Sequence, residues 1–319
     1  MDEFRFLDVL AGREVFVAAD GMTARAADAV APDAACESLF FPGCSLVNYA
    51  PALVAVLADY LAGAGTATST SLLCCGKILD YEEDGRRRRD AFDERLRKAV
   101  AKAGVRRFVV ACPNCAAALR RAFEGVDDAP EVAALPRVLA EMGCRIDEDA
   151  VRRVLAAKGF SLPEGRSVRL WVHDSCPDRG VGDFARGVRA LLPEGSVAND
   201  DPAQAAGCCG STARAAGKEQ AALAAGRRRA ETAADAGADA LVTACMSCAA
   251  SLTTAQDDLP VIHYLELLCD YPLDWRALAR PMALRFLLED DEASEAHTPS
   301  GGEAGRPFIN LAPSAKEAL

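Results

Sequence analysis

Short apolar runs alternate with longer stretches of helical periodicity along the chain. Four of these runs predict β-strands, over residues 38–41, 107–110, 168–172 and 240–243. After the first run, Leu53, Leu57 and Leu61 recur at helical spacing, and this pattern stops at Gly63. Stretches rich in Ala, Arg and Glu predict helices around the later strands. The alternation predicts an α/β fold with a parallel sheet in each half, whose ligand crevice lies at the C-terminal ends of the strands.

A duplicated cysteine pattern divides the chain into two halves. A single cysteine, a Cys-Cys-Gly triplet and a Cys-x-x-Cys motif follow one another twice, at offsets of 132, 134 and 133 residues. The first copy consists of Cys44, Cys74, Cys75, Cys112 and Cys115. The second copy consists of Cys176, Cys208, Cys209, Cys245 and Cys248. We therefore expect two homologous units.

The repeat and the local composition predict the domain organisation. Residues 37–145 form the first cysteine-rich domain and residues 168–287 the second. A leader, 1–36, precedes the first domain, and a linker, 146–167, joins the two. Residues 288–319 are acidic and rich in Gly, Ser and Pro, so we expect a disordered tail.

Composition and charge exclude several classes of protein. The chain has 319 residues, with 36 basic and 47 acidic side chains and a formal net charge of -11. This balance argues against nucleic acid as the main partner, because a phosphate backbone requires a basic surface. The sequence also lacks a secretory signal and any apolar run long enough to span a bilayer. We expect a cytoplasmic protein that does not span a membrane, in which clustered cysteines indicate metal or redox chemistry.

The cysteine spacing restricts the chemistry further. A Cys-x-x-Cys motif between a strand and a helix lets two sulfurs approach one metal or cluster. The side chains of adjacent cysteines point in different directions. They can therefore bind different iron atoms of one cluster more readily than they can bind a single tetrahedral ion. Five cysteines in each half are one more than a structural zinc site or a cuboidal [4Fe-4S] cluster requires. The pattern favours an unusual cluster, with zinc sites and buried thiols as alternatives.

Three cysteines, Cys36, Cys144 and Cys269, lie outside the repeat. Nothing in the pattern gives them a partner, and unpaired cysteines are among the residues most often found in protein interiors. We expect them to be ordinary core residues.

The residues around the repeated cysteines resemble a known family. The strings FFPGC, CCG and ACPNC, followed by HDSC, CCG and TACMSC, are similar to the tandem CCG domains of the heterodisulfide reductase B-subunit family. That family also includes iron–sulfur subunits of systems that oxidise glycolate, glycerol 3-phosphate and lactate. The resemblance covers about residues 38–271 and implies two pseudo-symmetric CCG domains, with clusters at the C-terminal ends of the strands.

The resemblance also implies cofactors and a reaction. Each half would bind one non-cubane [4Fe-4S] cluster through its five cysteines, so the two clusters would use all ten repeated positions. In that family a disulfide lies between the clusters and is cleaved reductively, which implies a small-molecule or protein disulfide as substrate. The chain departs from the family at Ser175 and at Met246-Ser247, where proline is common, but these changes leave all ten ligands in place.

An electron donor is implied as a partner. Many relatives carry a ferredoxin-type motif before the CCG domains, and nothing like it precedes Cys44. Electrons would then come from a ferredoxin-like iron–sulfur subunit or from a flavoprotein.

Further residues have both a functional and a structural interpretation. His173 lies three residues before Cys176 and could donate a proton to a departing thiolate, or it could fix the end of the strand. His263 is expected to lie on an apolar helix and to be structural. The basic runs Arg86–Arg89 and Arg227–Arg229 are expected to be solvated helix faces, or alternatively to attract an anionic disulfide or an acidic electron donor.

Three functions are compatible with this sequence. We favour an iron–sulfur oxidoreductase subunit that reduces a disulfide or passes electrons toward one. The first alternative is an electron-relay subunit of a dehydrogenase complex that acts on a 2-hydroxy acid or on glycerol 3-phosphate. The second is a zinc-stabilised assembly module without a redox role.

Overall fold

The computed structural model describes residues 3–28, 36–82, 84–199, 207–278, 282–284 and 286. The chain forms two compact units, Met1–Ala133 with Pro281–Leu319, and Ala134–Arg280. We refer to them as the first and the second unit. Each contains one copy of the cysteine pattern. The acidic tail expected over 288–319 lies outside the described residues, as do residues 29–35 of the expected leader.

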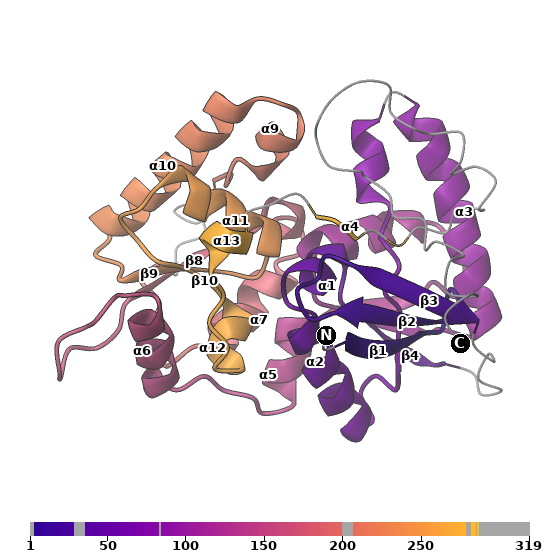
Figure 1. Ribbon diagram of the computed structural model, residues 1–319, viewed down its shortest axis with the longest axis horizontal. Helices are drawn as coiled ribbons and strands as arrows, with labels where there is room; N and C mark the ends of the chain where they lie inside the picture. The colour runs from indigo at the N-terminus through magenta and orange to yellow at the C-terminus, as the bar shows by residue number, and fades with distance from the viewer. Residues whose placement is uncertain are drawn as a thin grey trace. The chain divides into compact units, whose positions relative to one another are not determined.

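The first unit is built on a sheet with the strand order β3-β2-β1-β5-β4-β6-β7, of which β1 to β4 are labelled in Figure 1. Its strands are β1 (Glu3–Asp8), β2 (Arg13–Ala18), β3 (Ala24–Asp28), β4 (Ser38–Phe41), β5 (Ser69–Thr70), β6 (Arg107–Val110) and β7 (Glu131–Ala134). β4 pairs in parallel with both β5 and β6. The bounds of β4 and β6 are those predicted from their apolar runs, because their side chains fill the core of this unit.

The leader expected over residues 1–36 contributes three strands to this sheet. β1, β2 and β3 form an antiparallel meander, and β1 pairs in parallel with β5. Asp8, at the end of β1, accepts hydrogen bonds from the backbone N–H of Leu10 and Leu72 and from the hydroxyl of Ser71, the last at 2.7 Å. Burial raises the pKa of Asp8. These bonds tie the first residues to the sheet and explain why the leader is part of the first unit.

Helices cover the strands of the first unit. They are α1 (Cys44–Tyr49), α2 (Pro51–Gly63), the 3-10 helix η1 (Lys77–Tyr81), α3 (Gly85–Ala103) and α4 (Pro113–Ala122). α2 confirms the helix predicted from the leucine spacing, including its end at Gly63. Strand and helix therefore alternate as the sequence predicts.

A segment near the C-terminus belongs to the first unit. The side chain of Asn48 accepts a hydrogen bond from the N–H of Leu284 at 2.7 Å and donates one to its carbonyl at 2.6 Å. Residues 282–284 and 286 were expected within the second domain, 168–287, and these two bonds place Leu284 with α1 instead. The sequence contains no local signal for such a long-range contact.

The second unit repeats the arrangement on a smaller sheet. Its strands β8 (Leu170–His173), β9 (Ala240–Thr243) and β10 (Val261–His263) are parallel, in the order β10-β9-β8. Its helices are α5 (Leu135–Glu141), α6 (Glu148–Ala157), η2 (Cys176–Asp178), α7 (Asp183–Leu191), α9 (Ser211–Ala215), α10 (Glu219–Asp235), α11 (Met246–Ala255), α12 (Tyr264–Leu268) and α13 (Trp275–Leu278). β8, α10, β9 and α11 follow one another as β4, α3, β6 and α4 do in the first unit, which confirms the pseudo-symmetric α/β fold.

The segment expected to be a linker, 146–167, contains α6. Asp147 caps this helix by accepting the N–H of Ala150 at 2.6 Å, and Glu148 and Asp149 occupy the first turn. The boundary between the units precedes this segment, at residue 134. Among the described residues, no helix combines the length and the apolarity needed to cross a bilayer.

A buried ion pair connects α6 to α12. The Nζ of Lys158, just after α6, lies 2.7 Å from Oε2 of Glu266, whose side chain is fully buried. Glu266 also accepts hydrogen bonds from the N–H of His263, the N–H of Leu273 and the indole of Trp275. Burial raises the pKa of Glu266. The carboxylate therefore depends on Lys158 for charge compensation.

Lys158→Met is expected to lower the free energy of unfolding by about 3–5 kcal/mol, because it leaves a buried carboxylate without its cation. Urea unfolding measures this value. The control is Lys98→Met, which breaks an exposed i,i+4 pair with Glu94 and should cost less than about 1 kcal/mol. Equal losses in the two variants would contradict the role given to Lys158.

Candidate metal centres

Strand ends and helix starts position the cysteines in both units. Cys44 and Cys176 begin α1 and η2, shortly after β4 and β8. Cys112 and Cys245 are the N-caps of α4 and α11, each two residues after the end of a strand of the same sheet, with similar backbone angles. The parallel pairing of β4 with β6 and of β8 with β9 brings these positions to one edge of each sheet. The crevice predicted at the C-terminal strand ends is therefore where the cysteines gather.

The glycine of each Cys-Cys-Gly triplet allows a sharp turn at the cysteine pair. Gly76 and Gly210 have φ angles of +71° and +88° and are the N-caps of η1 and α9. A Cβ on Gly76 would lie 2.7 Å from the ring of Phe92, and one on Gly210 would lie 2.4 Å from the carbonyl of Ala222. Both glycines are thus required by backbone conformation and by close contact with the following long helix.

Gly76→Ala is expected to destabilise the metal-free protein more than Gly125→Ala. Both glycines have a φ of +71°, but a Cβ on Gly125 would meet nothing within 4 Å. The left-handed backbone costs about 1–2 kcal/mol in either variant, and the contact with Phe92 adds about 1–3 kcal/mol at Gly76. Urea unfolding under reducing conditions measures both, and equal losses would show that the packing at Gly76 does not matter.

The five thiols of the first unit form one connected network. Hydrogen bonds with Cys44, and then with Cys75, raise the pKa of Cys74 well above its usual value. Hydrogen bonds from Cys115 and Cys74 lower the pKa of Cys75 well below it. The pKa of Cys115 is raised well above its usual value by hydrogen bonds with Cys112 and Cys75. The sulfurs are thus connected in the order 44, 74, 75, 115 and 112.

The second unit repeats this network. Hydrogen bonds from Cys208 and Cys248, with a smaller contribution from His173, lower the pKa of Cys209. Hydrogen bonds with Cys209 and Cys245 raise the pKa of Cys248 well above its usual value. The Sγ atoms of Cys209 and Cys248 lie 3.2 Å apart. A hydrogen bond with Cys209 and burial raise the pKa of Cys208, and the charge of Cys176 adds to this, so all five cysteines of the motif interact.

The networks combine buried and accessible sulfurs. Cys74, Cys75 and Cys115 are buried in the first unit, and Cys44 and Cys112 are partly exposed. In the second unit, Cys209, Cys245 and Cys248 are buried, Cys176 is partly exposed and Cys208 is exposed. Each set therefore has a shielded side and a side that solvent reaches.

The donor set fits an iron–sulfur cluster. Five soft sulfur donors lie together in each unit, and iron–sulfur clusters are held by cysteine thiolates. The backbone also approaches the sulfurs closely, since a Cβ on Gly43 would lie 2.9 Å from the Sγ of Cys115. Zinc also accepts thiolates, but it takes four ligands and would leave one cysteine of each set unused.

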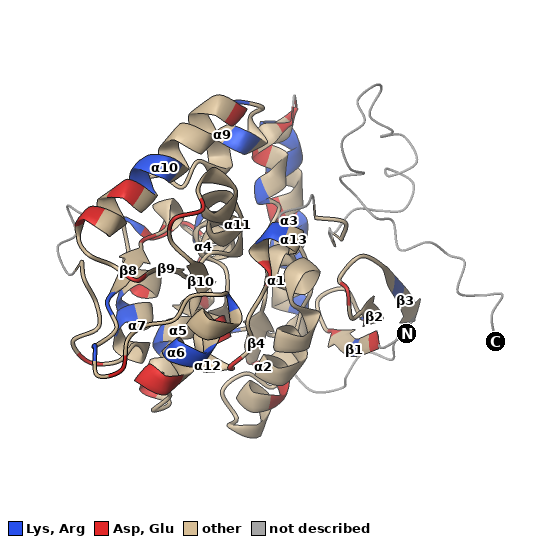
Figure 2. Ribbon diagram, turned by 60° about the vertical axis from the view of Figure 1, so that its left-hand side comes forward, with Lys and Arg blue, Asp and Glu red and all other residues tan. Residues whose placement is uncertain are grey.

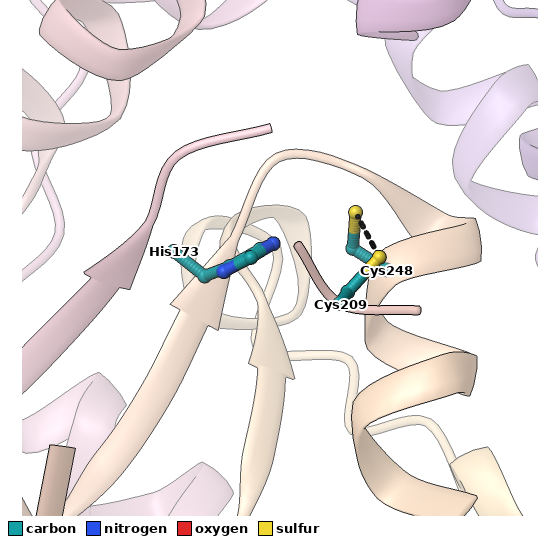
Figure 3. A group of neighbouring side chains, drawn as sticks. All are labelled: His173, Cys209 and Cys248. Carbon is teal, nitrogen blue, oxygen red and sulfur yellow. Dashed lines mark hydrogen bonds between the residues drawn. The ribbon is translucent and has the colours of Figure 1, made fainter. Parts of the chain in front are cut away.

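His173 distinguishes the second set from the first. It ends β8, its side chain is buried, and its imidazole points toward the sulfurs of Cys209 and Cys248 (Figure 3). One ligand atom from each of these three residues lies within 4.8 Å of the other two. Neither ring nitrogen makes a hydrogen bond of normal geometry to a described residue. The repeat offset of 132 aligns His173 with Phe41, so the first set lacks this imidazole.

His263 has the structural role expected for it. It ends β10 and is the N-cap of α12 rather than a residue within a helix. Its Nδ1 accepts the N–H of Leu265, and Glu266 completes a capping box. Burial lowers the pKa of His263 to about 3.

The three cysteines outside the repeat differ from one another. Cys36 is buried, as expected of a core residue, and its Sγ donates to the carbonyl of Ser38. Cys144 and Cys269 are partly exposed rather than core residues. Burial, and then the charge of Cys144, raise the pKa of Cys269 to about 11. These two cysteines therefore lie close to each other.

The sequence analysis missed two arginines beside the cysteine pairs. Arg89 and Arg229 end the two basic runs and are buried, whereas Arg87 and Arg228 are exposed. Helical spacing contained the signal for Arg89, because Phe92, Leu96 and Val100 follow it on the buried face of α3. The expectation of a solvated helix face is therefore wrong for the last residue of each run.

Comparisons with known proteins place both cysteine sets within matched regions. The CCG family model, described as a cysteine-rich domain, matches residues 38–120 and 171–253, which together exceed half of the chain. No curated protein matches the chain.

Two solved structures of racemases show a weak likeness to the chain. Glutamate racemase isoform RacE1 from Bacillus anthracis is 11% identical with a TM-score of 0.36, over 75% of this chain and 80% of that one. The aspartate racemase of Picrophilus torridus is 12% identical with a TM-score of 0.30, over 74% of this chain and 91% of that one. At these scores the likeness supports no inference about fold or function.

Proposed function

Because the chain belongs to the CCG cysteine-rich domain family and contains the domain twice, we propose that it is an iron–sulfur oxidoreductase subunit that reduces a disulfide. Each unit would hold one non-cubane [4Fe-4S] cluster through its five cysteines. The observation that carries this proposal is the joining of all five thiols into one network in each unit. Zinc would leave a fifth thiol without a function, whereas a polynuclear cluster can use adjacent cysteines on different iron atoms.

Residues of this chain would hold the cluster and leave it accessible to substrate. An iron–sulfur cluster, when bound, accepts and releases single electrons. The buried cysteines would hold each cluster within the fold, and the partly exposed Cys44, Cys112 and Cys176 and the exposed Cys208 would leave it accessible to a substrate sulfur. The overall step consumes two electrons and two protons and converts one disulfide into two thiols. The electrons come from a ferredoxin-like iron–sulfur subunit or a flavoprotein.

We assign His173 as the candidate proton donor for one departing thiolate. It is buried beside Cys209 and Cys248, and neither of its ring nitrogens makes a regular hydrogen bond to a described residue. General acids of this kind act from within hydrogen-bonding reach of the leaving group. This role would make the second cysteine set the one at which a thiol is released.

An anaerobic assay separates this function from the alternatives. Reduced methyl viologen serves as electron donor and glutathione disulfide or cystine as probe, and viologen oxidation and new thiols are both measured. We expect disulfide-dependent oxidation, with two electrons consumed per disulfide. Clusters that are reduced by viologen but never pass electrons to a disulfide would favour an electron-relay subunit, and a zinc-containing protein without iron would indicate an assembly module.

A further inference from the structure

Each long helix that follows a Cys-Cys-Gly triplet directs one buried arginine toward that triplet. Lys and Arg residues line α3 and α10 (Figure 2). Most of them face solvent, but Arg89 is 1% exposed and Arg229 is 9% exposed. A buried guanidinium is costly unless negative charge compensates it. Both units therefore place one buried arginine on the helix that follows the Cys-Cys-Gly triplet.

In the first unit, one nitrogen of Arg89 lacks a hydrogen-bond partner among the described residues. Its Nε donates to Oδ1 of Asp93 at 3.0 Å. Asp93 also accepts a hydrogen bond from Arg121 at 2.9 Å, so these three side chains carry a net charge of one positive unit. The Nη1 of Arg89 is buried and has no hydrogen-bond partner among the described residues. It would lie 3.2 Å from a Cβ on Gly76, the residue directly after Cys75.

In the second unit, Arg229 lies against the residue directly before Cys208. A Cβ on Gly207 would overlap its guanidinium, so a side chain at that position would displace Arg229. Arg179 donates to the carbonyl of the same glycine at 2.6 Å. Two arginines therefore flank the start of the second triplet. Burial lowers the pKa of Arg229, the like charges of Arg179 and Arg228 add to this effect, and Cys208 acts in the opposite direction.

We propose that Arg89 and Arg229 are positioning residues that place positive charge beside the two cysteine pairs and raise the reduction potentials of the clusters held there. This inference rests on the proposed function, because it assumes a cluster in each unit. A cluster with five thiolate ligands is strongly negative, and adding an electron is easier when a fixed cation lies nearby. Net charge and hydrogen bonds to the sulfurs are known determinants of cluster potential. The arginines would act through the cysteines without touching substrate.

The test compares buried and exposed members of the same basic run. Arg89→Gln is measured beside Arg87→Gln in protein whose second set is disabled by Cys209→Ser, so that the first cluster reports alone. Arg229→Gln is measured beside Arg228→Gln in a Cys75→Ser background. Arg121 continues to pair with Asp93 when Arg89 is replaced. Iron and sulfide content are determined first, and the midpoint potential then follows from a redox titration monitored by electron paramagnetic resonance.

We expect the two buried variants to keep their iron and to shift to a more negative potential. At fixed applied potential the ratio of reduced to oxidised cluster should fall about tenfold, which is 59 mV for a one-electron couple. The midpoint potential should not change in Arg87→Gln or Arg228→Gln, which replace exposed arginines. If glutamine prevents folding, Arg89→Lys and Arg229→Lys keep the charge and should match the parent potential.

The experiment distinguishes failure of this inference from failure of the proposed function. An unchanged potential in fully loaded Arg89→Gln and Arg229→Gln would overturn this inference and leave the proposed function intact. A tenfold fall in the ratio of reduced to oxidised cluster in Arg89→Lys or Arg229→Lys would also overturn it, because these variants keep the positive charge. Absence of iron and sulfide from the unsubstituted chain would instead reject the proposed function itself.

Discussion

A chain in which serine replaces Cys75 is expected to retain about four iron and four sulfide ions after anaerobic purification, half of the value for two clusters. Cys75 is the central member of the first network, since its sulfur interacts with both Cys74 and Cys115. Hydrogen bonds from Cys115 and Cys74 lower its pKa well below its usual value, which favours its thiolate form. Serine removes this thiolate and leaves the second unit unaltered.

The matched substitution in the other unit is Cys209→Ser. Cys209 is central to the second network in the same way, and its pKa is lowered by its neighbours Cys208 and Cys248. We expect the same loss of about half of the iron, and loss of nearly all iron when both substitutions are combined. The control is Cys36→Ser, which changes a buried thiol outside both networks and should keep the full content. Full iron content in Cys75→Ser would contradict the ligand assignment for the first unit.

His173→Phe is expected to lower the rate of disulfide reduction about 10²-fold without loss of iron, at the lower end of the range for general acid catalysis. Phenylalanine is chosen because Phe41 occupies the equivalent position in the first unit. The variant removes both ring nitrogens beside Cys209 and Cys248 while retaining an aromatic ring in a buried position. Turnover with reduced viologen, normalised to iron content, measures the effect.

The leaving group distinguishes proton donation from a structural role for His173. An aromatic disulfide releases a thiolate of low pKa that leaves readily without a proton, whereas an alkyl disulfide does not. We therefore expect the loss of rate in His173→Phe to be large with cystine and small with an aromatic disulfide. An equal loss with both substrates, or a loss of iron, would show that His173 fixes the end of β8 instead.

The sequence predicted the centre of each unit well and its edges less well. β4, β6 and β9 have the predicted bounds because each is a short apolar run that is buried on both faces. β1 to β3 carry mixed polar and apolar residues, and their place in the sheet depends on the long-range bonds of Asp8. α6 had a local signal in Asp147, Glu148 and Asp149, which the interpretation as a linker did not use.

The candidate site, like the fold, was predicted from the sequence only in part. The repeat predicted which ten cysteines belong together, because a duplicated spacing survives in the sequence without knowledge of the fold. It could not predict the order in which the sulfurs contact one another, which depends on how the turns at Gly76 and Gly210 place each pair. It also could not show that Arg229 is buried, because that depends on how α10 packs, whereas the signal for Arg89 lay in the helical spacing of α3.

The most direct test of two iron–sulfur sites is the composition of the protein purified without oxygen. Iron, zinc and acid-labile sulfide are determined per chain, and electron paramagnetic resonance spectra are recorded before and after a disulfide or thiol is added. We predict about eight iron and eight sulfide ions per chain, little zinc, and spectra that change when thiol is added. Two zinc ions per chain with no sulfide would contradict the proposed function.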